Sequence, residues 1–132
     1  MTKPILIIED DRDIADILRY SLETRRFETR MAATGDEGLA ASLDKINPPA
    51  LILMDLLLPG MNGIEICRQV RREQSTENIP IIMITAKASE IDFARAREVG
   101  VNDYIIKPFS VRNLIERIDV LLKQAGGSNS SE

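Results

Sequence analysis

Histidine and tryptophan are absent from this chain of 132 residues, and cysteine occurs once, as Cys67. Without histidine, the chain cannot build His-dependent catalytic triads or His metal sites, and it has no histidine to accept a phosphoryl group. A single cysteine excludes an internal disulfide and fits a cytoplasmic protein. Because Cys67 stands beside Ile66 and near Val70 in a helical pattern, we expect a buried, inert thiol.

Aromatic residues make up only 4% of the chain, so its core has to be mainly aliphatic. Hydrophobic residues reach 44% in total, which is enough for a folded core, and the length suits one compact domain. The net charge of −4 argues against a nucleic-acid-binding surface. The N-terminal apolar run, residues 5–8, is too short for a membrane span or a signal peptide. We therefore expect a soluble protein.

Five strand-like segments alternate with five helical patterns along the chain. One strand segment, residues 27–31, alternates apolar and polar positions and predicts a strand nearer an edge. The other four are continuous apolar runs, which are typical of strands buried on both faces: residues 5–8, 50–54, 80–85 and 103–106. The helical patterns cover residues 14–22, 36–45, 64–72 and 89–99, and a last helix that begins after Ser110 as its N-cap.

This alternation predicts an α/β fold with a doubly wound, five-stranded parallel sheet and helices on both faces. The strand order 2-1-3-4-5, the flavodoxin-like order, is the commonest for such a sheet, and we expect it here. Ligands then bind beyond the carboxyl ends of the strands, beside the first and third strands. We expect the domain to occupy residues 1–124, with residues 125–132 as a flexible tail or the start of a linker.

Charged and polar residues follow the strands at this edge. Glu9 and Asp10 follow the first strand, Asp55 the third and Lys107 the fifth, while Thr85 ends the fourth. Two carboxylates about 4 Å apart repel by about 4 kcal/mol at an effective dielectric near 20, and a divalent cation such as Mg²⁺ removes that conflict. Lys107 adds positive charge and Thr85 a hydroxyl donor. This combination suits a phosphoryl group carried on one carboxylate.

Each residue also has an ordinary structural interpretation. An aspartate after a strand often caps a helix, as Asp10 or Asp11 could, and Asp55 could belong to a turn. Thr85 could simply end a strand, and Lys107 could be solvated. The joint occurrence of these residue types at four strand ends favours a site. We expect Asp11, one residue beyond the acidic pair, to support the start of the first helix, where negative charge is favoured.

Four stretches in this order closely resemble the receiver domain of two-component response regulators: IIEDD, LMDLLLPGMNGIE, IIMITA and GVNDYIIKPFS. The resemblance covers about residues 3–124, and the last stretch is most similar to the winged-helix (OmpR/PhoB-type) subfamily. It implies a phosphoacceptor rather than an enzyme, which assists its own phosphorylation and slow dephosphorylation. Asp55 would accept the phosphoryl group of a phosphohistidine on a sensor histidine kinase or phosphotransfer protein.

The resemblance also implies a Mg²⁺ site. Asp10 and Asp55 would bind the ion directly, together with the backbone carbonyl of Leu57, and Glu9 would act through a metal-bound water. Lys107 would contact Asp55 and then the phosphoryl oxygens, and its bond to the following proline is expected to be cis.

The same resemblance implies a conformational switch, in which Thr85 swings toward the phosphoryl group and Tyr104 follows it inward. Leu57 and Lys87 would flank that group and influence its lifetime. Because the Leu57 side chain offers no hydrogen bond to orient water, we expect a long-lived aspartyl phosphate.

A homodimer through the fourth helix, fifth strand and fifth helix is implied by the subfamily. Asp103 and Arg117 match one charged pair of that interface, whereas Phe93 and Asn113 depart from another. Ordinary surface charge would explain Asp103 and Arg117 equally simply.

Three other functions stay open at this point. A dehalogenase-type phosphatase would usually place a second acid where Leu57 stands. A flavodoxin-like cofactor binder needs a hydroxyl- and glycine-rich phosphate loop where EDD stands, and those acids would repel phosphate without a metal. A degenerate receiver would act only as a protein-binding module, although no essential residue is missing.

Overall fold

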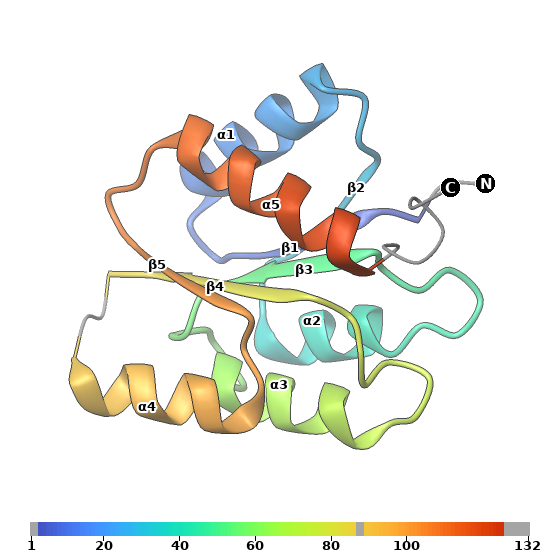
Figure 1. Cartoon of the computed structure of the whole chain (residues 1–132), viewed down its shortest axis with the longest axis vertical. Helices are drawn as coiled ribbons and strands as arrows, with labels where there is room; N and C mark the ends of the chain where they lie inside the picture. The colour runs from blue at the N-terminus through green and yellow to red at the C-terminus, as the bar shows by residue number, and fades with distance from the viewer. Residues whose placement is uncertain (1–2, 87–88, 126–132) are drawn as a thin grey trace.

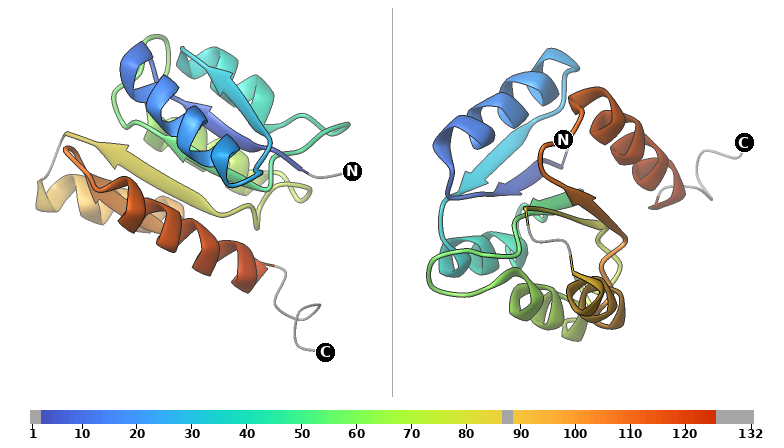
Figure 2. Two further views of the ribbon diagram at one scale, coloured as in Figure 1. Left: turned by 90° about the horizontal axis from the view of Figure 1, so that it is seen from above. Right: turned by 90° about the vertical axis from the view of Figure 1, so that its left-hand side faces the viewer.

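A computed structural model describes residues 3–86 and 89–125 as a five-stranded parallel sheet between two layers of helices (Figure 1). The strand order β2-β1-β3-β4-β5 confirms the prediction. In Figures 1 and 2, α1 and α5 cover one face, and α2, α3 and α4 cover the other. Along the chain the elements are β1 (Ile5–Ile8), α1 (Arg12–Thr24), β2 (Thr29–Ala32), α2 (Gly35–Ser42), β3 (Leu51–Met54), α3 (Gly63–Arg72), β4 (Ile81–Thr85), α4 (Glu90–Val99), β5 (Asp103–Ile106) and α5 (Val111–Ala125).

Several predicted boundaries differ from the structure, most by one or two residues. The second strand is Thr29–Ala32 rather than residues 27–31, so Phe27 lies before it and packs against the core. The second helix ends at Ser42, because the Asp44 carboxylate accepts hydrogen bonds from two backbone N–H groups beyond it and forms a turn. The helix α5 reaches Ala125, one residue beyond the expected domain end, and the tail after it lies outside the described residues.

The strands β1, β3 and β4 are buried on both faces, as continuous apolar runs predict. The same prediction was wrong for β5, of which only Ile105 is buried, because this strand lies at the edge of the sheet. Ile5 and Ile7 of β1 point into the core beneath α1 and α5, whereas Leu6 and Ile8 point into the core beneath α2, α3 and α4. Burying one such side chain contributes about 1.5–3 kcal/mol before the entropy cost of folding. The sheet thus provides a rigid base for the residues that follow its strands.

The helices begin at the carboxyl edge of the sheet and carry local caps there. Side-chain oxygens of Asp11, Thr34, Asn62 and Ser89 accept backbone N–H groups at the starts of α1 to α4. Ser110 accepts from the N–H group of residue 113, which confirms it as the predicted cap of α5. These caps fix the residue at which each helix begins. They therefore also fix the ends of the loops that carry the site. No helix in the described ranges has the length and apolarity needed to cross a membrane.

Candidate functional site

Backbone hydrogen bonds of the sheet continue one residue past the strands and place the polar residues at its carboxyl edge. The N–H group of Asp55 donates to the carbonyl of Ile8 at 3.1 Å. The N–H group of Lys107 likewise donates to the carbonyl of Thr85 at 2.9 Å. Because these backbones are bonded across the sheet, residues from distant parts of the chain meet in fixed positions.

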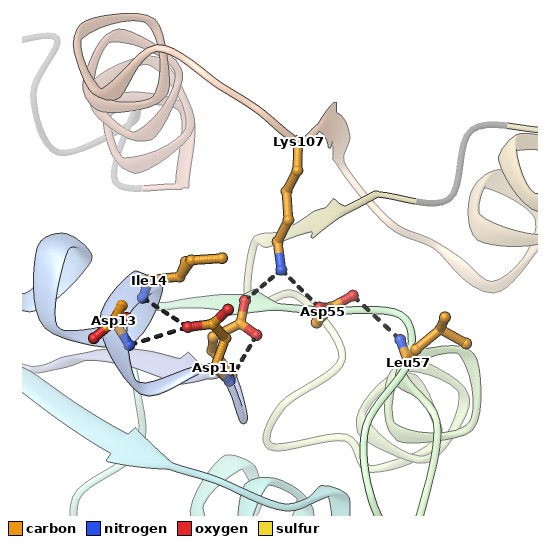
Figure 3. Close-up of polar contacts among 7 residues, drawn as sticks. Asp11, Asp13, Ile14, Asp55, Leu57 and Lys107 are labelled. Carbon is orange, nitrogen blue, oxygen red and sulfur yellow. Dashed lines mark hydrogen bonds and ion pairs between the residues drawn. The ribbon is translucent and has the colours of Figure 1, made fainter.

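Lys107 joins two carboxylates (Figure 3). Its Nζ donates to Asp55 Oδ2 at 2.8 Å and to Glu9 Oε1 at 2.9 Å. The side chains of Glu9, Asp55 and Lys107 are 3%, 10% and 16% exposed, respectively. The predicted contact between Lys107 and Asp55 is therefore present, and a second one, to Glu9, was not predicted from the sequence.

Electrostatics at this contact leave negative charge in excess. Burial raises the pKa of Glu9, although the hydrogen bonds from Lys107 and from the Asp11 N–H group act in the opposite direction. Burial alone would lower the pKa of Lys107, but its hydrogen bonds to Asp55 and Glu9 outweigh burial and raise that pKa. The lysine is therefore an ammonium ion at neutral pH. One ammonium faces three carboxylates once Asp10 is included.

The three acids are arranged closely enough to share a cation. Glu9, Asp10 and Asp55 each offer a carboxylate oxygen, and these oxygens lie within 4.8 Å of one another. Glu9 and Asp55 are buried, whereas Asp10 is exposed and leaves one side of the group open to water. An all-oxygen set of this kind suits a hard ion such as Mg²⁺ that keeps several waters.

Asp11 has a separate structural role. Its Oδ1 accepts the N–H groups of Asp13 at 3.0 Å and Ile14 at 3.2 Å, which confirms it as the cap of α1 (Figure 3). Its own N–H group donates to Glu9 Oε2 at 3.2 Å. Glu9 therefore accepts from Lys107 on one oxygen and from the start of α1 on the other, which holds its carboxylate in one orientation.

Leu57 lies at the rim of the site. Its N–H group donates to Asp55 Oδ1 at 3.2 Å, so both oxygens of Asp55 are engaged (Figure 3). The residue is 59% exposed, which leaves an apolar group in contact with water beside the acids. Lys87, the other predicted flanking residue, lies outside the described residues.

The predicted switch residues lie on β4 and β5. Thr85 is buried at the end of β4, and Tyr104 is half-buried on β5. The Tyr104 ring lies 4.2 Å, between centroids, from the ring of Phe93 on α4. Burial raises the pKa of the Tyr104 phenol, with smaller contributions from nearby acids. The sequence carried no signal for this ring contact, because the two residues belong to different elements.

The residues predicted at the dimer face also have contacts within one chain. Arg117 Nη1 donates to Asp103 Oδ1 at 2.5 Å, between α5 and β5.

The Lys107–Pro108 peptide bond is cis, as the resemblance implied.

Comparisons with known proteins agree on one family. Residues 5–119 match the family model described as the response regulator receiver domain. The phosphate regulon transcriptional regulatory protein PhoB of Rhizobium meliloti (strain 1021) is 38% identical over 125 residues, which cover 95% of this chain and 54% of that protein. This chain thus spans about half the length of that curated relative.

Solved structures share the fold over almost the whole chain. A CheY-like response regulator receiver domain protein from Methanospirillum hungatei JF-1 superposes with a TM-score of 0.88 at 32% identity, covering 97% of this chain and 99% of the other. The signal receiver domain of a signal transduction histidine kinase from Syntrophus aciditrophicus gives a TM-score of 0.83 at 31% identity, covering 99% and 96%.

Proposed function

The chain belongs to the receiver domain family of two-component response regulators, and from this premise we propose that Asp55 is its phosphoacceptor. A receiver takes its phosphoryl group from a histidine kinase and is a phosphoacceptor rather than an enzyme of the usual kind. The observation that carries the assignment is the bridge from Lys107 Nζ to Asp55 Oδ2 and Glu9 Oε1. Asp55 accepts from this ammonium on Oδ2 and from the Leu57 N–H group on Oδ1, and it follows β3, the central strand of the sheet.

The metal-binding residues would be Glu9, Asp10, Asp55 and the backbone carbonyl of Leu57. Asp10 and Asp55 would bind Mg²⁺ directly, and Glu9 through a water. Bound there, Mg²⁺ would neutralise charge on the acids and on the incoming phosphoryl oxygens. The closeness of the three carboxylate oxygens supports this assignment.

In the transfer step, an oxygen of Asp55 would attack phosphorus while the phosphorus–nitrogen bond to the kinase histidine breaks. The imidazole leaves with the electrons of that bond, and the product is an aspartyl phosphate. Lys107 would follow the negative charge from the carboxylate to the phosphoryl oxygens. Its raised pKa keeps it cationic throughout.

The response would pass from Thr85 to Tyr104 and then to an output domain or partner protein. We assign the chain to the winged-helix subfamily, which would place a DNA-binding output beyond the receiver; its likeness to a transcriptional regulatory protein supports this. The receiver would extend through Ala125, where α5 ends, and the residues after it would form a tail or linker. Because receivers take their phosphoryl group from kinases inside the cell, we place it in the cytoplasm.

The phosphorylated form would dimerise through α4, β5 and α5. The Asp103–Arg117 ion pair presents both residues on the surface formed by β5 and α5. In a dimer, either residue could exchange its partner for the equivalent residue of a second copy.

Labelling with acetyl phosphate tests the acceptor directly. In the presence of Mg²⁺, the wild-type protein should gain one acid-stable, base-labile phosphoryl group, measured by intact mass. Asp55→Asn should gain none, because an amide oxygen is a poor nucleophile, whereas Asp119→Asn on α5 should behave like wild type. Undiminished labelling of Asp55→Asn would refute the assignment.

A further inference from the structure

Arg71 lies in the last turn of α3, far from the acidic edge. Its guanidinium donates hydrogen bonds to oxygens of several segments. Its Nε and Nη2 donate to the carbonyl of Gly100 at 3.1 and 2.8 Å. Its Nη1 donates to the carbonyl of Ile79 at 2.8 Å, and Nη2 also donates to Asn102 Oδ1 at 2.9 Å. Within residues 3–86 and 89–125, no carboxylate forms an ion pair with it. This arginine therefore binds backbone and amide oxygens rather than acids.

The acceptors of Arg71 belong to three different parts of the fold. Gly100 ends α4 in the left-handed conformation, with φ of 98°. A Cβ at Gly100 would lie 2.8 Å from Arg71 Nε, so the glycine also leaves room for the guanidinium. Ile79 precedes β4, and Asn102 precedes β5 while its Oδ1 also accepts the N–H group of Ile81 at 2.8 Å. One side chain thus ties α3 to the end of α4 and to the starts of two strands.

Cys67, one turn earlier on α3, adds a contact to the same end of α4. Its Sγ donates to the carbonyl of Val99 at 3.3 Å. Burial raises the pKa of this thiol to about 11, so it stays protonated and remains a donor at neutral pH. The thiol, which the sequence predicted to be buried and inert, therefore adds another contact between α3 and the C-terminal end of α4.

The N-terminal half of α4 is held differently. Its first turn is capped by Ser89, whose Oγ accepts the Asp92 N–H group, and its Phe93 ring contacts Tyr104. Ala96 is the one buried residue among the ten of α4. The helix is therefore bonded firmly at its C-terminal end, while its other half rests on the tyrosine proposed as a switch residue.

We propose that Arg71 is a positioning residue that pins the C-terminal end of α4, so that phosphorylation moves mainly the N-terminal half of this helix. Movement of Tyr104 displaces Phe93, and α4 turns about the end held by Arg71. Because Arg71 holds the C-terminal end, α4 responds by rotating about that end, and the whole helix does not detach. This inference rests on the proposed function, because Tyr104 receives its movement from Asp55.

Amide hydrogen exchange, followed residue by residue by NMR, tests the pin in the unphosphorylated protein. Arg71→Met keeps the apolar stem and removes all four hydrogen bonds, and Arg71→Lys keeps the charge without the planar fork. Both should raise exchange of amides 97–101 about tenfold over wild type while the central strand amides stay protected. The matched control is Arg72→Met, at the exposed neighbouring arginine, which should change nothing there. Unchanged exchange at 97–101 in Arg71→Lys would overturn the pin.

The switch is tested with beryllofluoride and Mg²⁺, a stable mimic of the phosphoryl group. In wild type, the mimic should change exchange at amides 93–95 and leave 97–101 unaltered, whereas in the Arg71 variants the change should spread along the helix. Equal changes at both ends of wild-type α4 would overturn the proposal. Acetyl phosphate should label Arg71→Lys within about twofold of the wild-type rate. Absence of labelling in wild type would instead refute the proposed function. Hydrogen exchange of the unphosphorylated wild type and Arg71 variants would then still test whether Arg71 holds the end of α4.

Discussion

At the residue scale, Lys107 is the main cation of the site. It lies between two buried carboxylates and compensates both of them. Removing one partner of a buried ionic group costs more than the group contributes as a pair, because the remaining charges are left without compensation. Glu9 and Asp55 would then depend on another cation.

Replacing Lys107 should therefore make stability depend on Mg²⁺. We expect Lys107→Met to lower the free energy of unfolding by about 2–3 kcal/mol in EDTA, and millimolar Mg²⁺ to recover much of that loss. Urea unfolding with and without Mg²⁺ measures both effects. Lys123→Met, at an exposed lysine of α5, is the control. An equal Mg²⁺ response in wild type and Lys107→Met would contradict the role of Lys107 as the compensating charge.

Leu57 is the residue that solvent water contacts beside Asp55. Its exposed apolar side chain offers no hydrogen bond to hold an attacking water, and its N–H group is already bonded to Asp55. We expect a long-lived phosphoryl group in wild type, and a several-fold faster loss in Leu57→Asn. Decay of labelled protein after removal of acetyl phosphate measures this. Leu57→Ala, which adds no hydrogen bond, should change the rate less, and equal rates in wild type and Leu57→Asn would argue against the idea.

At the element scale, the loop between β1 and α1 divides its acids between two tasks. Glu9 and Asp10 belong to the acidic group, and Asp11 caps the helix. Neighbouring residues with the same charge thus act on different parts of the molecule, because the backbone turns between the end of the strand and the first turn of the helix.

Alanine substitutions should separate these tasks. Asp11→Ala should cost about 1 kcal/mol of stability through loss of the cap and leave labelling by acetyl phosphate close to wild type. Asp10→Ala should abolish Mg²⁺-dependent labelling with little change in the urea midpoint. Intact mass and urea unfolding on both variants check this. The interpretation would be wrong if Asp11→Ala lost labelling while remaining folded.

At the scale of the whole molecule, β5 and α5 meet at the Asp103–Arg117 ion pair. As a partly exposed pair within one chain, it contributes little to stability by itself. Its position at the edge of the sheet leaves it accessible to a second copy.

Under the proposed function, phosphorylation should promote association through this surface. We expect sedimentation velocity to show a monomer alone and a dimer with beryllofluoride and Mg²⁺, and Arg117→Ala to weaken the dimer. Arg112→Ala, at an exposed arginine elsewhere on α5, serves as the comparison. A monomer at high concentration with the mimic bound would rule out this interface.

Much of the fold and the site followed from the sequence because its signals are local. Continuous apolar runs predicted β1, β3, β4 and β5, and cap residues such as Asp11 and Ser110 predicted helix starts. The errors occurred where tertiary contacts compete with local pattern. Phe27 alternates correctly for a strand, yet it packs into the core before β2 begins.

The sequence by itself determined the fold class and the collection of acids and lysine at one edge, since parallel strands bring their carboxyl ends together whatever their lateral order. Only the tertiary structure decided which groups touch. The Glu9–Lys107 contact joins residues 98 positions apart, the Tyr104–Phe93 ring contact joins a strand to a helix, and Arg71 binds oxygens of three separate segments. Such contacts depend on lateral packing and side-chain rotamers, which periodicity does not encode.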